Sequence, residues 1–449
     1  MTPELSVRSV PYLDPIRAFA PFSGDPYGAF LDGGGRETGG RYSYIATDPY
    51  RVVGDGGGDP FTALEEELDR FRLPARPGLP PFQTGAAGFL GYGLGRYLEK
   101  LPPPRERGPA LPPMSMSFYD CVCAFENDTR KAWIMASNAG GRDGEALMEN
   151  MAARMAGAPP LAAPDWRVRG RWRAETERAD YEKKVARVID YIRAGDIFQA
   201  NLSQRFLAPM PGGLSSFSLY RRLRALSPAP FSAFLACGPG RAVLSASPER
   251  FLKLGSDGKV KTRPIKGTRP RGETPEEDRK LAGELRASEK DKAENLMIVD
   301  LLRNDLSRVC KTGSVRVSDL FTLESFACVH HLVSGVTGRL EDDTGAVDLL
   351  RAAFPGGSVT GAPKIRAMEI IHEMEFAQRG PYCGAIAWLG FGGAMDSSIT
   401  IRSIIIDGAG AVAQAGGGIV ADSDPATEFE ETLIKAGPLL ASLDPETSR

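Results

Sequence analysis

The chain has 449 residues, a length that suits two or three ordinary domains or one large domain with a deep core. Hydrophobic residues make up 42%, charged residues 25%, and the formal net charge is -2, so we expect a soluble globular protein with no nucleic-acid partner. The first residues lack the layout of a signal peptide, and no run of about 18 apolar residues is present to span a bilayer. A cytoplasmic protein without a membrane partner is expected.

The cysteines and histidines argue against a zinc site or a histidine-rich metal site. Six cysteines are spread along the chain without paired CxxC blocks, which favours reduced, buried thiols. Only three histidines are present, His330, His331 and His372. A bound metal would therefore need oxygen ligands.

A proline- and glycine-rich segment at about 155–171 predicts a boundary between two regions. The amino-terminal region, residues 1–160, contains short β-like runs separated by glycine clusters. The second region, residues 175–442, carries most of the recognisable chemistry.

Helices and strands alternate along the second region. A helix is predicted from Asp180 to Gly195, a strand in IFQANLSQRF, and a strand pair around the turn SDGK. Further helices are expected at about 275–310, 346–354, 362–377 and 425–441, and strands at about 382–391, 398–406 and 411–415. The mixture predicts an α+β (mixed α/β) fold with much antiparallel sheet.

Acidic residues recur at helical spacing on two of the predicted helices. Asp291 and Glu294 share one face at i and i+3, and Glu428, Glu431 and Lys435 do so near the carboxyl end. If the two faces meet, four carboxylates need a compensating cation, and Mg²⁺ prefers such oxygen ligands. The alternative is that each helix presents a solvated acidic face.

Two glycine-rich segments are predicted to be loops that receive an anion. FPGGSVTGAPK leads into a helix but lacks the lysine placement of a nucleotide-binding loop, and QAGGGIVADS places Gly416, Gly417 and Gly418 between a strand and the acidic helix. Arg402, in the strand-like SSITIRSIII, is suited to grip a carboxylate, although a structural ion pair explains it equally well. Together these features favour a small dicarboxylate substrate.

Nine motifs between about 178 and 440 occur in an order that resembles the chorismate-utilising enzymes: GDIFQANLSQRF, SASPERF, TRPIKGTRPRG, EKDKAENLMIVDLLRNDL, HHLVSG, FPGGSVTGAPKIRAMEII, CGAIAW, TIRSI and QAGGGIVADSDPATEFEETLIKA. This group holds the anthranilate, aminodeoxychorismate, isochorismate and salicylate synthases. The resemblance implies the chorismate-binding enzyme fold, in which large antiparallel β-sheets pack as a sandwich flanked by helices.

The resemblance also implies roles for individual residues. Mg²⁺ would be held by Glu294 and Glu431, with Asp291 and Glu428 alongside or acting through water. Glu249 would be the general acid that protonates the departing C4 hydroxyl, and His331 would lie near the substrate. The residues expected to bind chorismate are Asn201, Thr360, Tyr382, Arg402, Gly416, Gly417, Gly418 and Lys435.

Gln199, Lys266 and, more weakly, Asn201, where anthranilate synthases tend to have an apolar residue, decide the branch within the family. Water-using members have a lysine where this chain has Gln199, and an amide cannot serve as a base. Anthranilate synthases resemble PIAGT where this chain has PIKGT, so Lys266 favours the aminodeoxychorismate synthase branch. There, a neutral Lys266 would add at C2, and ammonia would then attack C4. The alternatives are an anthranilate synthase component I, which aminates C2 and eliminates pyruvate, and an inert regulatory homologue.

No glutaminase motif is visible, because no cysteine nucleophile has the required glycine turn and histidine partner. Ammonia is therefore expected from a separate glutamine amidotransferase subunit. The family also implies a separate lyase that converts 4-amino-4-deoxychorismate to 4-aminobenzoate, a precursor of folate.

Overall fold

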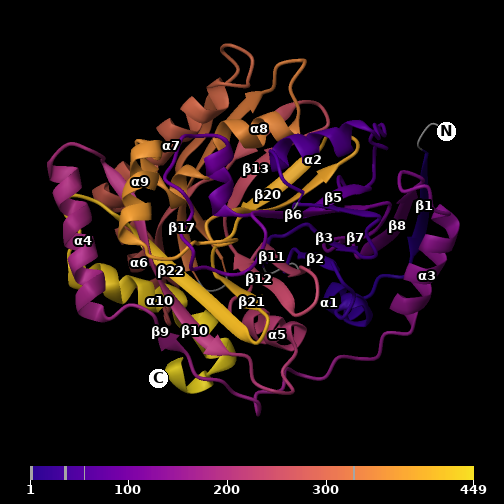
Figure 1. Ribbon diagram of the computed structural model, residues 1–449, viewed down its shortest axis with the longest axis horizontal. Coiled ribbons are helices and arrows are strands. Elements are labelled where there is room, and N and C mark those ends of the chain that lie inside the picture. The colour runs from indigo at the N-terminus through magenta and orange to yellow at the C-terminus, as the bar shows by residue number, and fades with distance from the viewer. Residues whose placement is uncertain (1–3, 35–37, 55, 327–328, 449) are drawn as a thin grey trace.

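The computed structural model describes residues 4–34, 38–54, 56–326 and 329–448. The described strands form two antiparallel sheets that pack face to face, with helices on the outer sides (Figure 1). The prediction of a mixed fold, with large antiparallel sheets packed as a sandwich and flanked by helices, is confirmed. Five described cysteines are free and buried, and Cys328 lies outside the described residues.

The first sheet contains twelve described strands. In spatial order they are β1 (Leu5–Val10), β8 (Lys131–Ser137), β7 (Cys121–Glu126), β3 (Tyr42–Ala46), β2 (Ala29–Asp32), β11 (Phe231–Ala236), β12 (Arg241–Ser247), β21 (Ser403–Asp407), β22 (Gly410–Ile419), β10 (Gln199–Pro209) and β18 (Gly361–Ala362), with β9 (Arg173–Ala174) beside β10. Strand β10 is buried on both faces instead of alternating, because helices cover its outer side.

The second sheet contains ten described strands. They are β15 (Ile265–Pro270), β17 (Val329–Arg339), β14 (Lys259–Thr262), β13 (Arg250–Leu254), β20 (Met395–Ile399), β19 (Ala385–Gly390), β5 (Gly85–Leu90), β6 (Met114–Tyr119) and β4 (Arg51–Val53), with β16 (Arg316–Ser325) beside β17. The pair predicted around SDGK is the hairpin of β13 and β14.

The helices flank the sandwich. The α-helices are α1 (Pro15–Phe19), α2 (Pro60–Asp69), α3 (Gly144–Ala156), α4 (Arg178–Arg193), α5 (Ser216–Leu226), α6 (Pro275–Ala287), α7 (Glu289–Ser307), α8 (Ala346–Ala353), α9 (Lys364–Met374) and α10 (Pro425–Leu443), and the short 3₁₀ helices are η1 (Ala20–Phe22), η3 (Tyr92–Tyr97), η4 (Gly357–Val359) and η5 (Pro445–Ser448). The helix predicted at 275–310 is two helices, because Ser288 ends α6 and caps α7.

Both sheets draw strands from the two regions predicted from the sequence. In the first sheet β2 pairs with β11, and in the second sheet β5 pairs with β19. The interior between the sheets is filled by side chains from both regions, including Tyr44, Phe89 and Trp388. The hydrophobic core is therefore continuous across residues 1–160 and 175–442.

The prediction of one continuous strand at 398–406 is wrong, because this segment contains parts of two strands. Residues up to Ile399 belong to β20 in the second sheet, and residues from Ser403 belong to β21 in the first sheet. A second crossing lies beside it, between β12 and β13, and the two are bonded together: Ile399 N–H donates to the Glu249 carbonyl at 3.1 Å, and Ala246 N–H donates to the Arg402 carbonyl at 3.0 Å. Both sheets therefore meet at Glu249 and Arg402.

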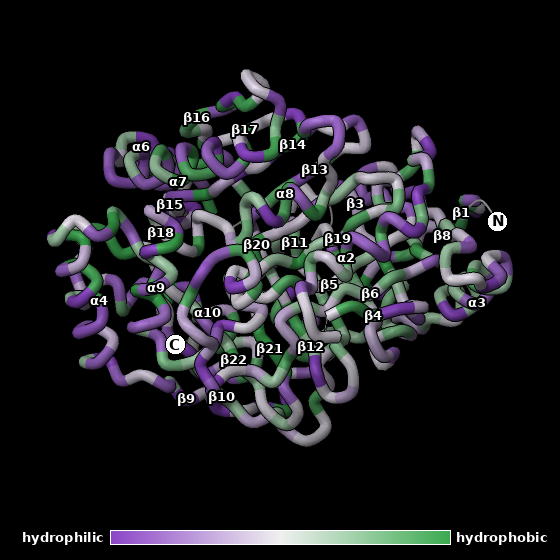
Figure 2. Tube along the Cα trace, turned by 45° about the horizontal axis from the view of Figure 1, so that its top comes forward, coloured by the Kyte–Doolittle hydropathy of each residue, from purple (hydrophilic) through white to green (hydrophobic). Residues whose placement is uncertain are grey.

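Helices α4, α6, α7, α9 and α10 gather at one end of the molecule, away from β1 and α3 (Figure 1). Figure 2 shows hydrophilic stretches along α4, whereas β21 in the middle of the molecule is mostly apolar. None of the described helices combines the length and the apolar character that a membrane span needs.

Candidate active site

The three glycines predicted to form a loop lie inside strand β22, and the loop prediction is wrong. Gly416, Gly417 and Gly418 pair with Ser203, Leu202 and Asn201 of β10. Glycine is required because a Cβ on Gly416 would lie 2.2 Å from the Leu202 carbonyl oxygen. Strand β22 thus places three residues without side chains, Gly416–Gly418, directly beside β10.

Gln199 begins β10 beside these glycines. Its side chain is 2% exposed, and neither amide atom has a hydrogen-bond partner among the described residues. A Cβ on Gly418 would lie 2.0 Å from Gln199 Nε2 and 3.4 Å from Lys266 Nζ. A buried polar group without a partner is rare in folded proteins, so the amide is suited to contact a ligand.

Lys266 lies on β15 and faces this same space. Its charge acts on Glu249, Glu294 and Glu431, and it counteracts the rise in their pKa values that burial causes. Lys266 forms no hydrogen bond or ion pair within the described part of the chain. Its amine is therefore not committed to a structural partner.

Glu249 lies at the crossing between β12 and β13, and it is 6% exposed. Burial raises the pKa of its carboxyl to about 7, against the opposing effects of a hydrogen bond with Ser358, the charge of Lys266 and a backbone hydrogen bond at Ile265. The carboxyl is therefore partly protonated near neutral pH. A carboxyl in this state can donate a proton to a leaving group.

Helices α7 and α10 carry the predicted carboxylates, and Glu294 of α7 lies close enough to Glu431 of α10 for their charges to interact. Burial raises the pKa of Glu294, and the charges of Asp291 and Glu431 add to the rise. Burial also raises the pKa of Glu428, which is 4% exposed and whose Oε2 has no partner among the described residues. A Cβ on Gly417 would lie 2.9 Å from this Oε2.

Glu431 differs from its two neighbours. Burial favours a higher pKa, but Lys435, Lys266 and Lys290 together lower the pKa of Glu431 below its ordinary value. The Lys435 ammonium lies 2.5 Å from Glu431 Oε1 and donates to the Gly416 carbonyl at 3.0 Å. Lys435 therefore links α10 to β22 and keeps Glu431 ionised.

Asp291 forms an ion pair with Arg269. Its Oδ2 lies 3.2 Å from the Arg269 guanidinium, and a Cβ on Gly267 would lie 2.9 Å from its Cγ. In the described chain no three histidine, cysteine, aspartate or glutamate side chains gather closely enough to hold a metal ion by themselves. A metal here would rely on one or two carboxylates together with a ligand or water.

Arg402 is not in a strand, contrary to the prediction, but at the crossing between β20 and β21, with φ of 51°. Its partly buried guanidinium forms no hydrogen bond or ion pair among the described residues, and its charge acts on Tyr382 and His331. This side chain is suited to grip an anion.

His331 accompanies Arg402. Burial, together with the charges of Arg402 and His330, lowers the pKa of His331 to about 4. Its Nδ1 lies 2.9 Å from the Thr268 hydroxyl, two residues beyond Lys266. The imidazole is therefore neutral at physiological pH.

The buried ion pair of Arg379 and Glu375 supports two further predicted residues, Asn201 and Thr360. Arg379 donates two hydrogen bonds to Glu375 (2.7 and 2.8 Å) and also reaches the carbonyls of Asn201 at 2.6 Å and Val359 at 3.0 Å. Thr360 is fully buried, and its carbonyl accepts from Asn201 N–H at 2.7 Å. Arg379 thus fixes the backbone that presents Asn201 and Thr360.

Sequence reasoning missed Lys290, Ser358 and Arg379. The first two carry a signal: Lys290 lies at i and i+4 with Glu294, and Ser358 lies in the motif FPGGSVTG. Arg379 carries a local signal only for its ion pair, because Glu375 lies four residues before it, whereas its carbonyl partners Val359 and Asn201 are 20 and 178 residues away.

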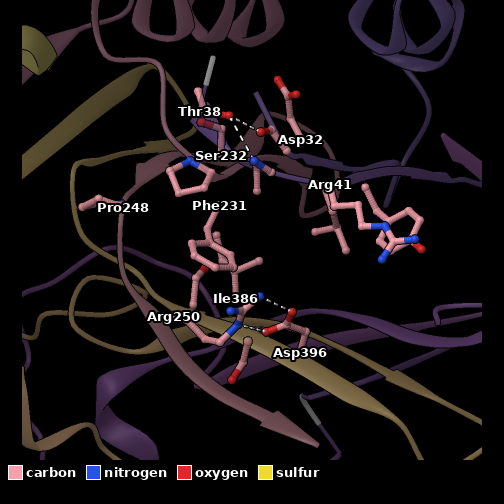
Figure 3. Close-up of a pocket in the computed structure, with 18 of the residues that line it drawn as sticks. Asp32, Thr38, Arg41, Phe231, Ser232, Pro248, Arg250, Ile386 and Asp396 are labelled. Carbon is pink, nitrogen blue, oxygen red and sulfur yellow. Dashed lines mark hydrogen bonds and ion pairs between the residues drawn. The ribbon is translucent and has the colours of Figure 1, made fainter. Parts of the chain in front are cut away.

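A cavity of about 400 Å³ is lined by residues of both sheets (Figure 3). Its lining includes Pro248 and Ile265, the chain neighbours of Glu249 and Lys266. Arg250 and Asp396 both line the cavity, and Arg250 donates two hydrogen bonds to Asp396, at 2.9 and 3.0 Å.

The chain matches the family model described as chorismate binding enzyme over residues 32–441. It is 43% identical to anthranilate synthase component 1 of Streptomyces coelicolor, over 96% of this chain and 86% of the relative, and 42% identical to aminodeoxychorismate synthase component 1 of Klebsiella aerogenes, over 95% and 96%. The crystal structure of anthranilate synthase component I from Streptococcus pneumoniae is similar, with a TM-score of 0.80, 34% identity, and coverage of 89% of this chain and 92% of that one. The resemblance read from the motifs is confirmed, and the chain belongs to the chorismate binding enzyme family.

Proposed function

We propose that this protein aminates chorismate at C4, with ammonia, to give 4-amino-4-deoxychorismate. The observation that carries the proposal is the position of Lys266. Its amine lies among Glu249, Glu294 and Glu431, next to the bare backbone of Gly418, and has no partner among the described residues. A nucleophile needs this freedom.

The reaction proceeds in two displacements. In the first, the neutral Lys266 amine forms a bond to C2, the ring double bonds shift, and the C4–O bond breaks as Glu249 gives its proton to the departing hydroxyl, which leaves as water. In the second, ammonia forms a bond to C4, the ring double bonds shift back and the Nζ–C2 bond breaks with its electron pair returning to Nζ, which regenerates the neutral Lys266 amine. The new ammonium at C4 returns one proton to the Glu249 carboxylate. Water does not compete through Gln199, because an amide cannot serve as a general base.

Glu294 and Glu431 would hold a Mg²⁺ ion, with Glu428 close by. The buried Glu428 Oε2 has no partner among the described residues, and a cation would satisfy it. When bound, Mg²⁺ supplies positive charge for a substrate carboxylate, and it commonly uses only one or two protein carboxylates. Asp291, whose Oδ2 lies 3.2 Å from the Arg269 guanidinium, would lie alongside or act through water.

The substrate carboxylates have further partners on the protein. Arg402 would bind one carboxylate, and the backbone of Gly416–Gly418 leaves room for the ring. Tyr382 and Asn201 would complete the pocket, and the neutral His331 would lie beside the substrate. Lys435 acts indirectly, because it already bonds Glu431 and Gly416.

The ammonia would come from a separate glutamine amidotransferase subunit, in the cytoplasm. The names of several relatives include "component 1", which supports a partner component. A separate lyase would then convert the product to 4-aminobenzoate for folate synthesis.

An anthranilate synthase component I is the second candidate, because relatives at 43% identity over nearly the whole chain carry that name. Purified protein should be incubated with chorismate, Mg²⁺ and ammonium, with and without the lyase. The proposal requires 4-aminobenzoate that forms only with the lyase. Anthranilate formed without it would establish the second candidate, and unchanged chorismate would indicate an inert homologue.

The covalent step has its own test. Lys266→Ala should lower kcat by at least about a hundredfold, a typical loss for a nucleophile. Acid-quenched wild-type protein should carry the mass of the ring adduct on the peptide that contains Lys266. Lys259→Ala is the matched control, because that side chain is 73% exposed and, among the described residues, pairs only with the exposed Asp257. Wild-type turnover by Lys266→Ala would overturn the covalent mechanism.

A further inference from the structure

A second cavity, of about 380 Å³, lies between η3, the proline-rich segment 101–113 and the end of α9. Its size is within the range of about 300–1,000 Å³ that is usual for small-molecule sites. The cavity does not include Lys266, Glu249 or the acidic helices. It is therefore distinct from the site described above.

Two arginines give this cavity a positive charge. Arg96 donates to the Pro102 carbonyl at 2.7 Å and lies 3.3 Å from His372 Nδ1, and Arg105 donates to the His372 carbonyl at 2.7 Å. Neither guanidinium forms an ion pair with a carboxylate in the described chain. Glu375 also lines the cavity, but Arg379 already neutralises it.

The histidine of the cavity does not add a charge. Burial and the charges of Arg105 and Arg96 lower the pKa of His372 below its ordinary value, so the imidazole is neutral at physiological pH. The two guanidinium charges therefore have no counter-ion supplied by the described residues. Partly buried cations without counter-ions are suited to bind an anion.

Two residues that line the cavity each carry a buried polar atom without a hydrogen-bond partner among the described residues. These atoms are the hydroxyl of Tyr92, a residue that is 8% exposed, and Nε of Arg105. The Tyr92 ring is held by the Arg379 guanidinium, 4.6 Å from its centroid. Unsatisfied polar atoms at a cavity wall are the kind that a bound molecule satisfies.

The rest of the wall is apolar. Pro109, Pro112, Leu111, Met368 and Ile371 line it, and these side chains offer a surface for a flat hydrocarbon body. A fully hydrated anion such as phosphate gains nothing from that surface. The combination favours a ligand with one charged end and one apolar end.

We propose that this cavity binds a small monocarboxylate with an aromatic-sized apolar body, the carboxylate facing Arg96 and Arg105 and the body facing Met368 and the prolines. The site does not depend on the proposed reaction.

The test uses the full chain and benzoate as the probe, with binding followed by ligand-observed NMR. Benzoate should bind, and benzamide, which has the same shape without the charge, should bind at least about tenfold more weakly. Arg105→Gln and Arg96→Gln should each raise the Kd for benzoate at least about tenfold. Tyr92→Phe should raise it severalfold, and it removes a hydroxyl without a described partner, so the fold should be unaffected.

Two control variants assign the binding to this cavity. Arg402→Gln alters the candidate active site, Arg41→Gln alters the cavity of Figure 3, and both should leave the Kd for benzoate unchanged. Equal affinity for benzamide, loss of binding in either control, or unchanged binding in folded Arg105→Gln and Tyr92→Phe would each overturn the proposal. Tighter binding of inorganic phosphate than of benzoate would also overturn it.

Discussion

Gln199 and Gly418 approach so closely that a methyl group on Gly418 would lie 2.0 Å from Gln199 Nε2. The contacted atom is the end of a flexible side chain, so Gly418→Ala should fold while displacing the Gln199 amide. We expect kcat/KM for chorismate to fall at least about tenfold. Steady-state kinetics and circular dichroism measure the two effects. Gly283→Ala, on α6 with no atom within 4 Å of its Cβ position, should change neither.

Gly416→Ala should fail in a different way. Its Cβ would lie 2.2 Å from the Leu202 carbonyl oxygen, which is backbone and cannot move aside cheaply. Overpacking of this kind costs about 1–3 kcal/mol or more. Chemical denaturation should therefore show a clear loss of stability for Gly416→Ala and little for Gly418→Ala. Equal stability of the two variants would contradict this geometry.

The raised pKa of Glu249, about 7, makes stability depend on pH. The folded state holds this proton between about pH 4.5 and 7, where the unfolded chain releases it, so the group's contribution to stability declines as pH rises through that window. Glu249→Gln removes the effect and should stabilise the protein by up to about 3 kcal/mol at about pH 8, with little change near pH 4.5.

Denaturant titration at both pH values measures this difference, and the same variant should lose most of its activity because it cannot donate the proton. Glu430→Gln, an exposed acid paired with Arg178, is the control and should show no comparable pH dependence. A Glu249→Gln variant that is less stable than wild type at alkaline pH would contradict the assigned ionisation.

Arg379 and Glu375 form a buried pair, with side chains 2% and 8% exposed. Arg379→Ala would leave Glu375 uncompensated and should lower the free energy of unfolding by about 3–5 kcal/mol. Arg72→Ala breaks a pair whose side chains are 83% and 59% exposed, and it should cost less than about 1 kcal/mol. Thermal or chemical denaturation of both variants provides the comparison.

Glu431→Gln tests the proposed Mg²⁺ site without reference to activity. The lost carboxylate should raise the Kd for Mg²⁺ at least about tenfold in isothermal titration calorimetry. Glu430→Gln changes the adjacent residue, whose side chain is 51% exposed, and should leave Mg²⁺ binding intact. Unchanged Mg²⁺ binding by Glu431→Gln would exclude this residue as a ligand.

The sequence was sufficient where local periodicity determines the outcome. The i and i+3 spacing of Asp291 and Glu294 placed both on one face of a helix. The class of the fold followed from the mixture of helices and strands together with the motifs. These features depend on residues a few positions apart.

The sequence was insufficient where contacts with distant segments determine the local structure. Three glycines in a row favour a loop, yet β10, about two hundred residues earlier, pairs with them and makes them a strand. Arg402 was predicted to lie in a strand because the residues on both sides of it are apolar. No local pattern indicates that these two flanking segments, β20 and β21, belong to different sheets. The i,i+4 spacing of Glu375 and Arg379 is visible in the sequence, but the contacts of Arg379 with the carbonyls of Val359 and Asn201 are not, because these partners are remote in sequence.

The paired crossings at Glu249 and Arg402 also bear on the motions of the molecule. Two neighbouring strand pairs, β12–β13 and β20–β21, cross from one sheet to the other at the same place. One sheet therefore cannot slide over the other without breaking the backbone hydrogen bonds that join the two crossings. A ligand bound there restrains both sheets at once. Saturation with chorismate should therefore slow backbone amide exchange in strands of both sheets, including strands that do not contact the ligand.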